Sequence, residues 1–176
     1  WKGHTTERRG NIKYNEERIN KIFNEIYELP EIKWEVLPKD VTIQQANQEK
    51  DIKSFISYAV GCMVGRYSID ESGLIFAGGV FDLSKYKSFS PTKDNILILS
   101  DDEYLSDNIL DRFINFLSIC YGKQRLEENL KYIADVLGNS GDSPRSIIRN
   151  YFINEFYIDH VKMYQKRPIY WLYDSG

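Results

Sequence analysis

The stretch DIKSFISYAVGCMVGRYSIDESGLIFAGG, residues 51–79, decides the fold of this chain. Its first half is an apolar helix pattern, whose inward positions recur at spacings of three and four residues: Ile52, Phe55, Ile56, Ala59, Val60 and Met63. Such a wide apolar stripe is typical of a helix that is buried on much of its surface. Gly61 and Gly65 lie on or near the stripe, and two small residues four apart let another backbone approach closely. The sequence therefore predicts that this helix is the centre of the core.

The region before this stretch predicts one further helix. Asn15 is a typical N-cap residue, and apolar residues at helical spacing follow it over 19–29. Residues 1–14 are polar and show no clear period, so we interpret them as a loosely ordered lead or a helix end. The central helix itself has two candidate start signals, Thr42 and Asn47, and the sequence does not choose between them.

The region after it predicts three more helices. Apolar periodicity indicates helices over 109–120 and 126–137, and Gly138 is placed to end the second of them. Ser143 is then an N-cap residue followed by proline at the first helical position. From there we expect one long aromatic helix to about Gln165.

Short β-like runs complete the pattern. LIFA, VFDL and ILIL fall within residues 67–99, and IYWLY occupies residues 169–173. The predicted fold class is therefore mainly α, with about five amphipathic helices around one core. We also expect a small β hairpin or short strands near 67–99 and a terminal strand near 169–173.

The composition excludes several classes of protein. In 176 residues, 42% are hydrophobic and 14% are aromatic, which excludes a disordered chain. The net charge of −3 argues against an autonomous DNA-binding module, which is usually basic. Cys62 and Cys120 are far apart and are interpreted as reduced thiols, not as a disulfide framework or a zinc site. No apolar run approaches the roughly 20 residues of a membrane span, so we expect a cytoplasmic protein without membrane contact.

No set of catalytic residues is recognisable. An amino-methyltransferase holds its target amine with an Asn/Asp-Pro-Pro-aromatic turn, but the five prolines of this chain are never adjacent. His160 has charged neighbours in a helix and is interpreted as a surface or half-buried histidine, not as a general base. We therefore assign no catalytic, cofactor-binding or metal-binding residue, and we expect that the chain itself is not an enzyme.

Six basic residues are candidates for contact with a DNA backbone. Arg66 follows the central helix, with Asp70 and Glu71 just beyond, so an ion pair at the helix exit, a phosphate contact and a contact with a partner domain are all open. The other five lie along the last helix and its exit: Arg145, Arg149, Lys162, Lys166 and Arg167. A continuous helix would align several of them in one stripe. They form either a solvated helix face or the wall of a groove that touches DNA.

Several segments, taken in order, resemble one family. They are NEERINKIF at 15–23, KDVTIQQANQEKDIKSFISYAVGCMVGRYSID at 39–70, GLIFAGG at 73–79, LEENLKYIADVLG at 126–138 and IIRNYFINEFYIDHVKMYQKRPIYWLYDSG at 147–176. The segments GCMVGRYSID and QKRPIYWLYDSG are the most specific. The chain resembles the PglX family, the large adenine-specific DNA methyltransferases of BREX phage-defence systems, which are related to single-chain type IIG and IIL restriction-modification enzymes.

The resemblance implies a fragment of a much longer protein. In that protein a methyltransferase domain, preceding this segment, transfers a methyl group from S-adenosylmethionine to adenine N6 in double-stranded DNA. The family's cofactor and catalytic motifs do not occur here, so no active-site residue is carried over. In such enzymes the region after the methyltransferase core is helical spacer and target-recognition structure. We accordingly interpret residues 15–176 as a single helical spacer or recognition-associated domain.

Two functional hypotheses follow from this resemblance. In the first, the chain is a non-catalytic segment that positions DNA recognition relative to the methyltransferase domain and contributes DNA backbone contacts. In the second, it is a protein-interaction module that docks other subunits of the defence complex and does not touch DNA. The salt dependence of DNA binding distinguishes them, because phosphate contacts release counterions.

Overall fold

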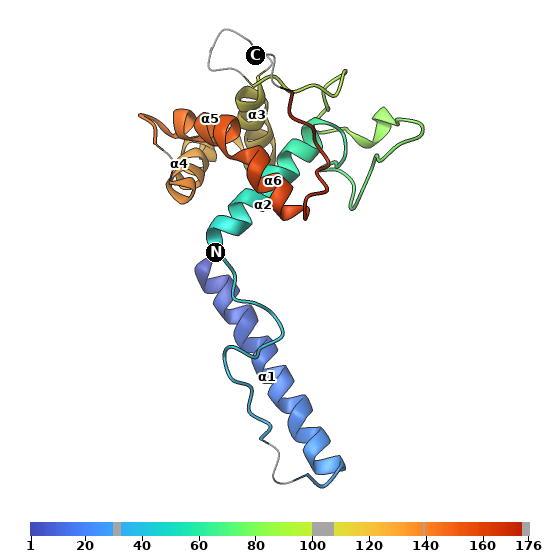
Figure 1. Cartoon of the computed structure of the whole chain (residues 1–176), viewed down its shortest axis with the longest axis vertical. Coiled ribbons are helices and arrows are strands. Elements are labelled where there is room, and N and C mark those ends of the chain that lie inside the picture. The colour runs from blue at the N-terminus through green and yellow to red at the C-terminus, as the bar shows by residue number, and fades with distance from the viewer. Residues whose placement is uncertain (30–32, 100–107, 139, 174–176) are drawn as a thin grey trace. The chain divides into compact units, whose positions relative to one another are not determined.

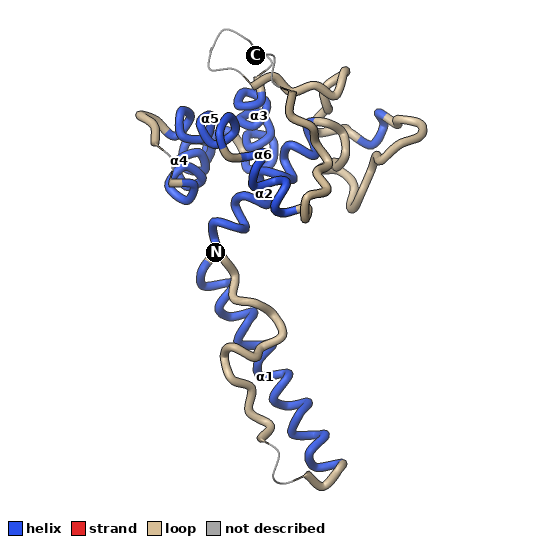
Figure 2. The backbone as a smooth tube through the Cα atoms, in the orientation of Figure 1, coloured by secondary structure: helices blue, strands red, loops and turns tan. Residues whose placement is uncertain are grey.

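The structure is a computed structural model that describes residues 1–29, 33–99, 108–138 and 140–173 (Figure 1). It divides into two compact units, Trp1–Gln48 and Glu49–Gly176. The described residues contain six α-helices and two short 3-10 helices joined by loops (Figure 2). The prediction of a mainly α protein is therefore confirmed. The interpretation of residues 15–176 as one domain stays a prediction.

The first unit consists of α1, Lys2–Ile26, and a return segment, residues 33–47, which runs back along it (Figure 1). The helix begins at Lys2, so the predicted start at Asn15 is wrong and residues 2–14 are helical. Local polar contacts hold this part of the helix, for example the ion pair of Lys13 with Glu17 at 3.3 Å. Because these residues lack an apolar period, a search for hydrophobic spacing does not detect the helix.

The second unit is built around α2, Gln48–Met63, which begins directly after Asn47, one of its two predicted caps. Four further helices follow in the order α3, Ile109–Tyr121; α4, Leu126–Leu137; α5, Pro144–Asn154; and α6, Phe156–Met163. The 3-10 helix η2, Lys123–Arg125, joins α3 to α4. Fully or almost fully buried side chains from four of these helices form the core: Ile56, Val60, Met63, Phe113, Phe116, Leu117, Leu130, Ile148, Tyr151 and Phe152. Helix α2 contributes buried side chains to this core, as the sequence predicts, and its place at the centre stays a prediction.

Gly61 of α2 is required by close side-chain packing. A Cβ atom at this position would lie 2.3 Å from Cδ2 of Tyr67 and 2.9 Å from the hydroxyl of Tyr170. The close approach that the sequence predicts is therefore made by aromatic side chains and not by another backbone. Gly65 has a different role, because its φ of 75° is the left-handed conformation that favours glycine where the chain leaves the helix.

The region after α2 is a loop that side chains hold in place. The carboxylate of Asp70 accepts hydrogen bonds from the backbone amides of Lys87 and Ser88, each at 2.8 Å. The hydroxyl of Ser68 donates to the carbonyl of Lys85 at 2.7 Å. This last contact reaches the 3-10 helix η1, Leu83–Lys85.

The predicted hairpin or short strands near 67–99 and the predicted strand near 169–173 are wrong. Among the described residues of these runs, the only ladder contact is an isolated parallel bridge between Ile98 and Asn108. A strand needs a neighbouring strand to satisfy its backbone groups, and here side chains and turns satisfy several of them instead. Apolar β-branched and aromatic runs alone therefore give a false strand signal.

The terminal segment, residues 169–173, is fixed by α2 and α6. The backbone amide of Ile169 donates to Nε2 of His160 at 3.0 Å, and the hydroxyl of Tyr170 donates to the carbonyl of Ser57 at 2.9 Å. His160 is only 1% exposed, so its interpretation as a surface or half-buried histidine is wrong. Since Nε2 accepts a hydrogen bond, the ring proton lies on Nδ1, which is 3.4 Å from the hydroxyl of Ser57. Burial lowers the pKa of His160 to about 4.

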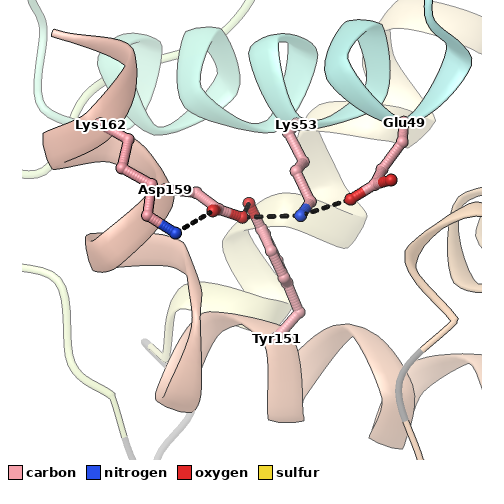
Figure 3. Close-up of polar contacts among 5 residues, drawn as sticks. All are labelled: Glu49, Lys53, Tyr151, Asp159 and Lys162. Atoms are coloured by element: carbon pink, nitrogen blue, oxygen red, sulfur yellow. Dashed lines mark hydrogen bonds and ion pairs between the residues drawn. The ribbon is translucent and has the colours of Figure 1, made fainter. Parts of the chain in front are cut away.

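A charged cluster joins α2, α5 and α6 (Figure 3). Nζ of Lys53 lies 2.8 Å from Oδ2 of Asp159 and 2.7 Å from Oε1 of Glu49. The hydroxyl of Tyr151 donates to the same carboxylate of Asp159 at 3.4 Å, and Nζ of Lys162 lies 3.9 Å from it. Burial disfavours the charged form of Lys53, but the hydrogen bonds to Asp159 and Glu49 outweigh it and raise the pKa of Lys53. The cluster therefore fixes the position of α6 against α2.

We expect Lys53→Met to lower the free energy of unfolding by about 2 kcal/mol. This loss lies between the losses measured when exposed and buried ion pairs are broken. The side chains of Lys53 and Asp159 are only 18% and 20% exposed, so the substitution leaves a largely buried carboxylate without its main partner. Urea unfolding of the chain measures the change. Lys162→Met is the control, because that lysine is 73% exposed and its contact is long. Equal effects of the two substitutions would contradict the structural role of Lys53.

The stability of the chain should also depend on the protonation of His160. Its pKa is lower in the folded chain, about 4, than its ordinary value of 6.5, so the unfolded chain binds the proton more tightly. The stabilising contribution is complete above pH 6.5 and is lost as the pH falls toward 4, by up to about 3 kcal/mol. His160→Gln keeps an acceptor for the amide of Ile169 but does not titrate. If the pH dependence of unfolding between pH 6.5 and 4 is the same in this variant, the prediction fails.

Candidate functional site

The basic residues at the end of α6 form the most exposed group among the six candidates. Lys162 lies in the last turn of the helix, and Lys166 and Arg167 follow four and five positions later. The chain reverses here, since Lys166 has a φ of 65° and its amide donates back to the carbonyl of Val161 at 2.8 Å. All three basic side chains belong to exposed residues. We call Lys162, Lys166 and Arg167 the α6 basic end.

Arg149 does not share a helix with this group. The long helix predicted from Ser143 to about Gln165 is wrong, because Glu155 leaves helical geometry at φ −127° and ψ −33° and separates α5 from α6. A single basic stripe along one helix therefore does not exist. Arg149 is half-buried on α5.

Arg145, at the start of α5, is already engaged in an ion pair. Its guanidinium forms two hydrogen bonds with the carboxylate of Glu127 on α4, with distances of 2.9 Å and 2.5 Å. The hydrogen bond from Arg145 lowers the pKa of the Glu127 carboxyl and raises the pKa of Arg145. This two-bond geometry is the strongest form of an arginine–carboxylate pair. Contact with a phosphate would have to compete with it.

Arg66 turns inward at the exit of α2. Its amide donates to the carbonyl of Gly61 at 2.8 Å, and its buried Nε has no hydrogen-bond partner among the residues that the structure describes. The ion pair with Asp70 that the sequence suggested is not formed in the described residues, where Asp70 instead accepts from the amides of Lys87 and Ser88. Arg66 is therefore half-buried and has an unused donor.

Arg66 lines an apolar cleft of about 770 Å³ in the second unit. Aliphatic and aromatic side chains form most of its wall, including Val60, Ile98, Phe152 and Trp171. Arg66 is the charged residue among the described residues that line it. Such a wall accommodates an apolar group, and the guanidinium adds one polar contact that fixes orientation.

Sequence patterns did not reveal this cleft. Residues 169–173 were expected to be a strand, but they border the cleft, and Trp171 is 80% exposed there. That Trp171 and Arg66 line the same cleft is visible only in the folded chain. The remaining apolar surface in the same segment includes Tyr173, which is 95% exposed.

Within the residues that the structure describes, no group of three or more His, Cys, Asp or Glu side chains is placed to hold a metal ion. None of the helices in that part of the chain combines the length and apolar character needed to cross a membrane. Cys62 and Cys120 are both free thiols.

The chain is similar to part of two adenine-specific methyltransferases. No model of a protein family matches it. It is 48% identical over 180 aligned residues to the adenine-specific methyltransferase PglX of Lacticaseibacillus casei strain Zhang, and the match covers 100% of this chain and 15% of that protein. It is 40% identical over 148 residues to the adenine-specific methyltransferase BrxX of Escherichia coli O9:H4 strain HS, with 77% of this chain and 12% of that protein covered.

The chain thus spans a small share of the length of these relatives. It matches an internal part of the first relative, and that match includes both structural units. The resemblance to the PglX family that the motifs predict is confirmed: over its whole length, the chain matches an internal segment of a PglX adenine-specific methyltransferase.

Proposed function

We propose that the chain is a non-catalytic segment of a site-specific adenine-N6 DNA methyltransferase of a BREX-like phage-defence system. In this proposal it positions DNA recognition relative to the methyltransferase domain. The observation that carries the proposal is the 48% identity, from end to end of the chain, with an adenine-specific methyltransferase. An identity this high over the whole chain indicates a shared fold and a shared place in the longer protein.

The physical requirement for such a segment is rigidity. An enzyme that modifies a base inside a duplex must extrude that base into its pocket, so the catalytic and recognition surfaces need a fixed spacing. The close-packed core around α2 supports this role, because interiors at native packing density resist deformation. The charged cluster of Lys53, Asp159 and Tyr151 adds directional contacts between helices of the same unit.

The chemistry belongs to the longer protein in this proposal. We expect that protein to use S-adenosylmethionine, to bind double-stranded DNA and to act in the cytoplasm, where other defence-system subunits are candidate partners. No catalytic, cofactor-binding or metal-binding residue of this chain is assigned. Its own contribution is architectural and electrostatic.

Among the six DNA-backbone candidates, the α6 basic end has the best geometry for phosphate contact. Lys162 is 73% exposed, and Lys166 and Arg167 follow within five positions on the exposed exit of the helix. Arg145 is paired with Glu127, and Arg66 is turned toward the apolar cleft. The proposal therefore ranks the α6 basic end above these two arginines.

The second candidate function is a protein-interaction module without DNA contact. The observation that favours it is the cleft around Arg66, together with the exposed side chains of Trp171 and Tyr173. Large exposed aromatic side chains beside an apolar cleft are typical of protein contact surfaces. In this function the occupant would be another subunit of the defence complex.

We expect the 176-residue chain alone not to bind S-adenosylmethionine. The reason is that the proposal places the cofactor pocket in the methyltransferase domain of the longer protein. Isothermal titration calorimetry of the chain with S-adenosylmethionine provides the measurement. Saturable binding with a stoichiometry near one would show that this chain contains a cofactor pocket, and would contradict the proposal.

Neutralising the α6 basic end should weaken DNA binding by the full-length methyltransferase in a salt-dependent way. The triple variant Lys162→Gln, Lys166→Gln and Arg167→Gln removes up to three phosphate contacts. The slope of log K against log salt concentration should then become less steep by about 0.9 per lost contact. Fluorescence anisotropy with labelled duplex DNA at several salt concentrations measures this slope.

The matched control carries the same change of charge elsewhere. Lys123, Arg125 and Lys131 are exposed residues of η2 and α4, and their replacement by Gln should leave the slope unchanged if the effect is local. An unchanged slope in the α6 triple variant would exclude DNA contact through this group. If Trp171→Ala impairs assembly with other defence subunits while DNA binding is intact, the interaction-module function is supported instead.

A further inference from the structure

Helix α1 carries an apolar stripe that the described residues of the first unit leave about half exposed. The helix spans 25 residues, and none of them is buried. Four apolar side chains near its C-terminal end are about half exposed: Ile19 at 52%, Ile22 at 45%, Phe23 at 52% and Ile26 at 66%. We call these four residues the α1 stripe. Phe23 also stacks on Tyr27, with ring centroids 6.0 Å apart, and so extends the apolar surface.

The return segment is hydrogen-bonded to another side of α1. It contacts polar residues of α1 instead: Oε1 of Glu17 accepts from the amide of Val36 at 3.2 Å, and Nδ2 of Asn20 donates to the carbonyl of Trp34 at 3.3 Å. With about 100° of rotation per residue, Glu17 and Asn20 lie roughly a quarter of a turn or more from the centre of the stripe. The contacts within the first unit therefore leave the apolar side of α1 open.

A helix with this surface is expected to have a partner. Helices in proteins gain most of their stability from packing an amphipathic face, and α1 has such a face without packing. Clusters of exposed apolar side chains on one helix face mark contact surfaces, unlike single scattered ones. The stripe is therefore an interaction surface.

The spacing of the stripe indicates that the partner is a helix. Ile19, Ile22 and Ile26 follow the three-then-four spacing of a heptad seam, which packs knobs-into-holes against another helix with the same pattern. A strand or an extended peptide would offer side chains with a period of two, which does not match this seam. The occupant that fits is an amphipathic helix.

We propose that the α1 stripe packs against an amphipathic helix of the same longer polypeptide, from the part outside residues 1–176. The argument for this occupant is the alignment with PglX, which includes α1 but covers only 15% of the relative, in an internal position. Most of such a protein lies outside the chain and is covalently attached to it, so its effective concentration at α1 is high. This inference rests on the proposed function, because it takes the chain as a segment of a methyltransferase.

Cysteine labelling of the full-length methyltransferase, purified without other proteins, tests the inference. Ile22→Cys places a thiol in the stripe, and Lys21→Cys places one at the neighbouring position on the other side of the helix, where the residue is exposed. We expect N-ethylmaleimide to modify the cysteine at 22 at least tenfold more slowly than the cysteine at 21. Peptide mass spectrometry reads the two sites separately from Cys62, Cys120 and other thiols.

A second pair of cysteine variants and a dilution series complete the test. Ile26→Cys with Glu25→Cys repeats the comparison one turn later if the first variant does not fold. Equal rates at stripe and control positions would overturn the inference. Protection that disappears on dilution would also overturn it, because it would show that a second copy covers the stripe. The salt slope of DNA binding is a separate readout, so failure of the DNA-contact proposal leaves this test unaffected.

Discussion

Burial of α2 is the constraint on which the second unit depends. Ile56, Ala59 and Met63 are completely buried, and the ring of Phe55 contacts the rings of Phe113 and Phe116 on α3 with centroid distances of 6.3 and 5.9 Å. Rigid aromatic side chains fill large volumes in few conformations, so they restrict how neighbouring helices can approach. Helices α3 and α5 add buried side chains to the same core, and α6 is joined to α2 by the pair of Asp159 with Lys53.

Polar contacts then select one arrangement among those that apolar burial would allow. Lys53 connects α2 to Asp159 of α6, and His160 of α6 accepts a hydrogen bond from the amide of Ile169. Polar groups inside a protein are stable only with partners, so each of these contacts specifies a position along and around the helix. One consequence concerns function. With the buried side of α6 fixed in this way, Lys162, Lys166 and Arg167 remain at the surface.

Local signals predicted much of the helical framework correctly. Ser143 is the N-cap of α5 in a capping box with Ser146, and Gly138 ends α4 in the left-handed conformation with a φ of 67°. Such signals work because caps depend on residues within one turn. The strand predictions failed for the opposite reason, since a strand exists only if a distant segment pairs with it. The sequence predicted the basic residues of the candidate site but not which of them are available for contact with DNA. Arg145, for example, is paired with Glu127, which lies 18 positions earlier in the chain.

The sequence by itself determined the mainly α class, most helix ends and the resemblance to the PglX family, because these follow from short-range patterns and motifs. Only the tertiary structure decided that the last helix breaks at Glu155 and that His160 is buried. It also decided that the apolar cleft contains Arg66. These features arise from contacts between residues far apart in the chain, such as the hydrogen bond between Ser57 and Tyr170 across 113 positions. Burial and pairing at such separations are set by packing of the whole core, which no local pattern records.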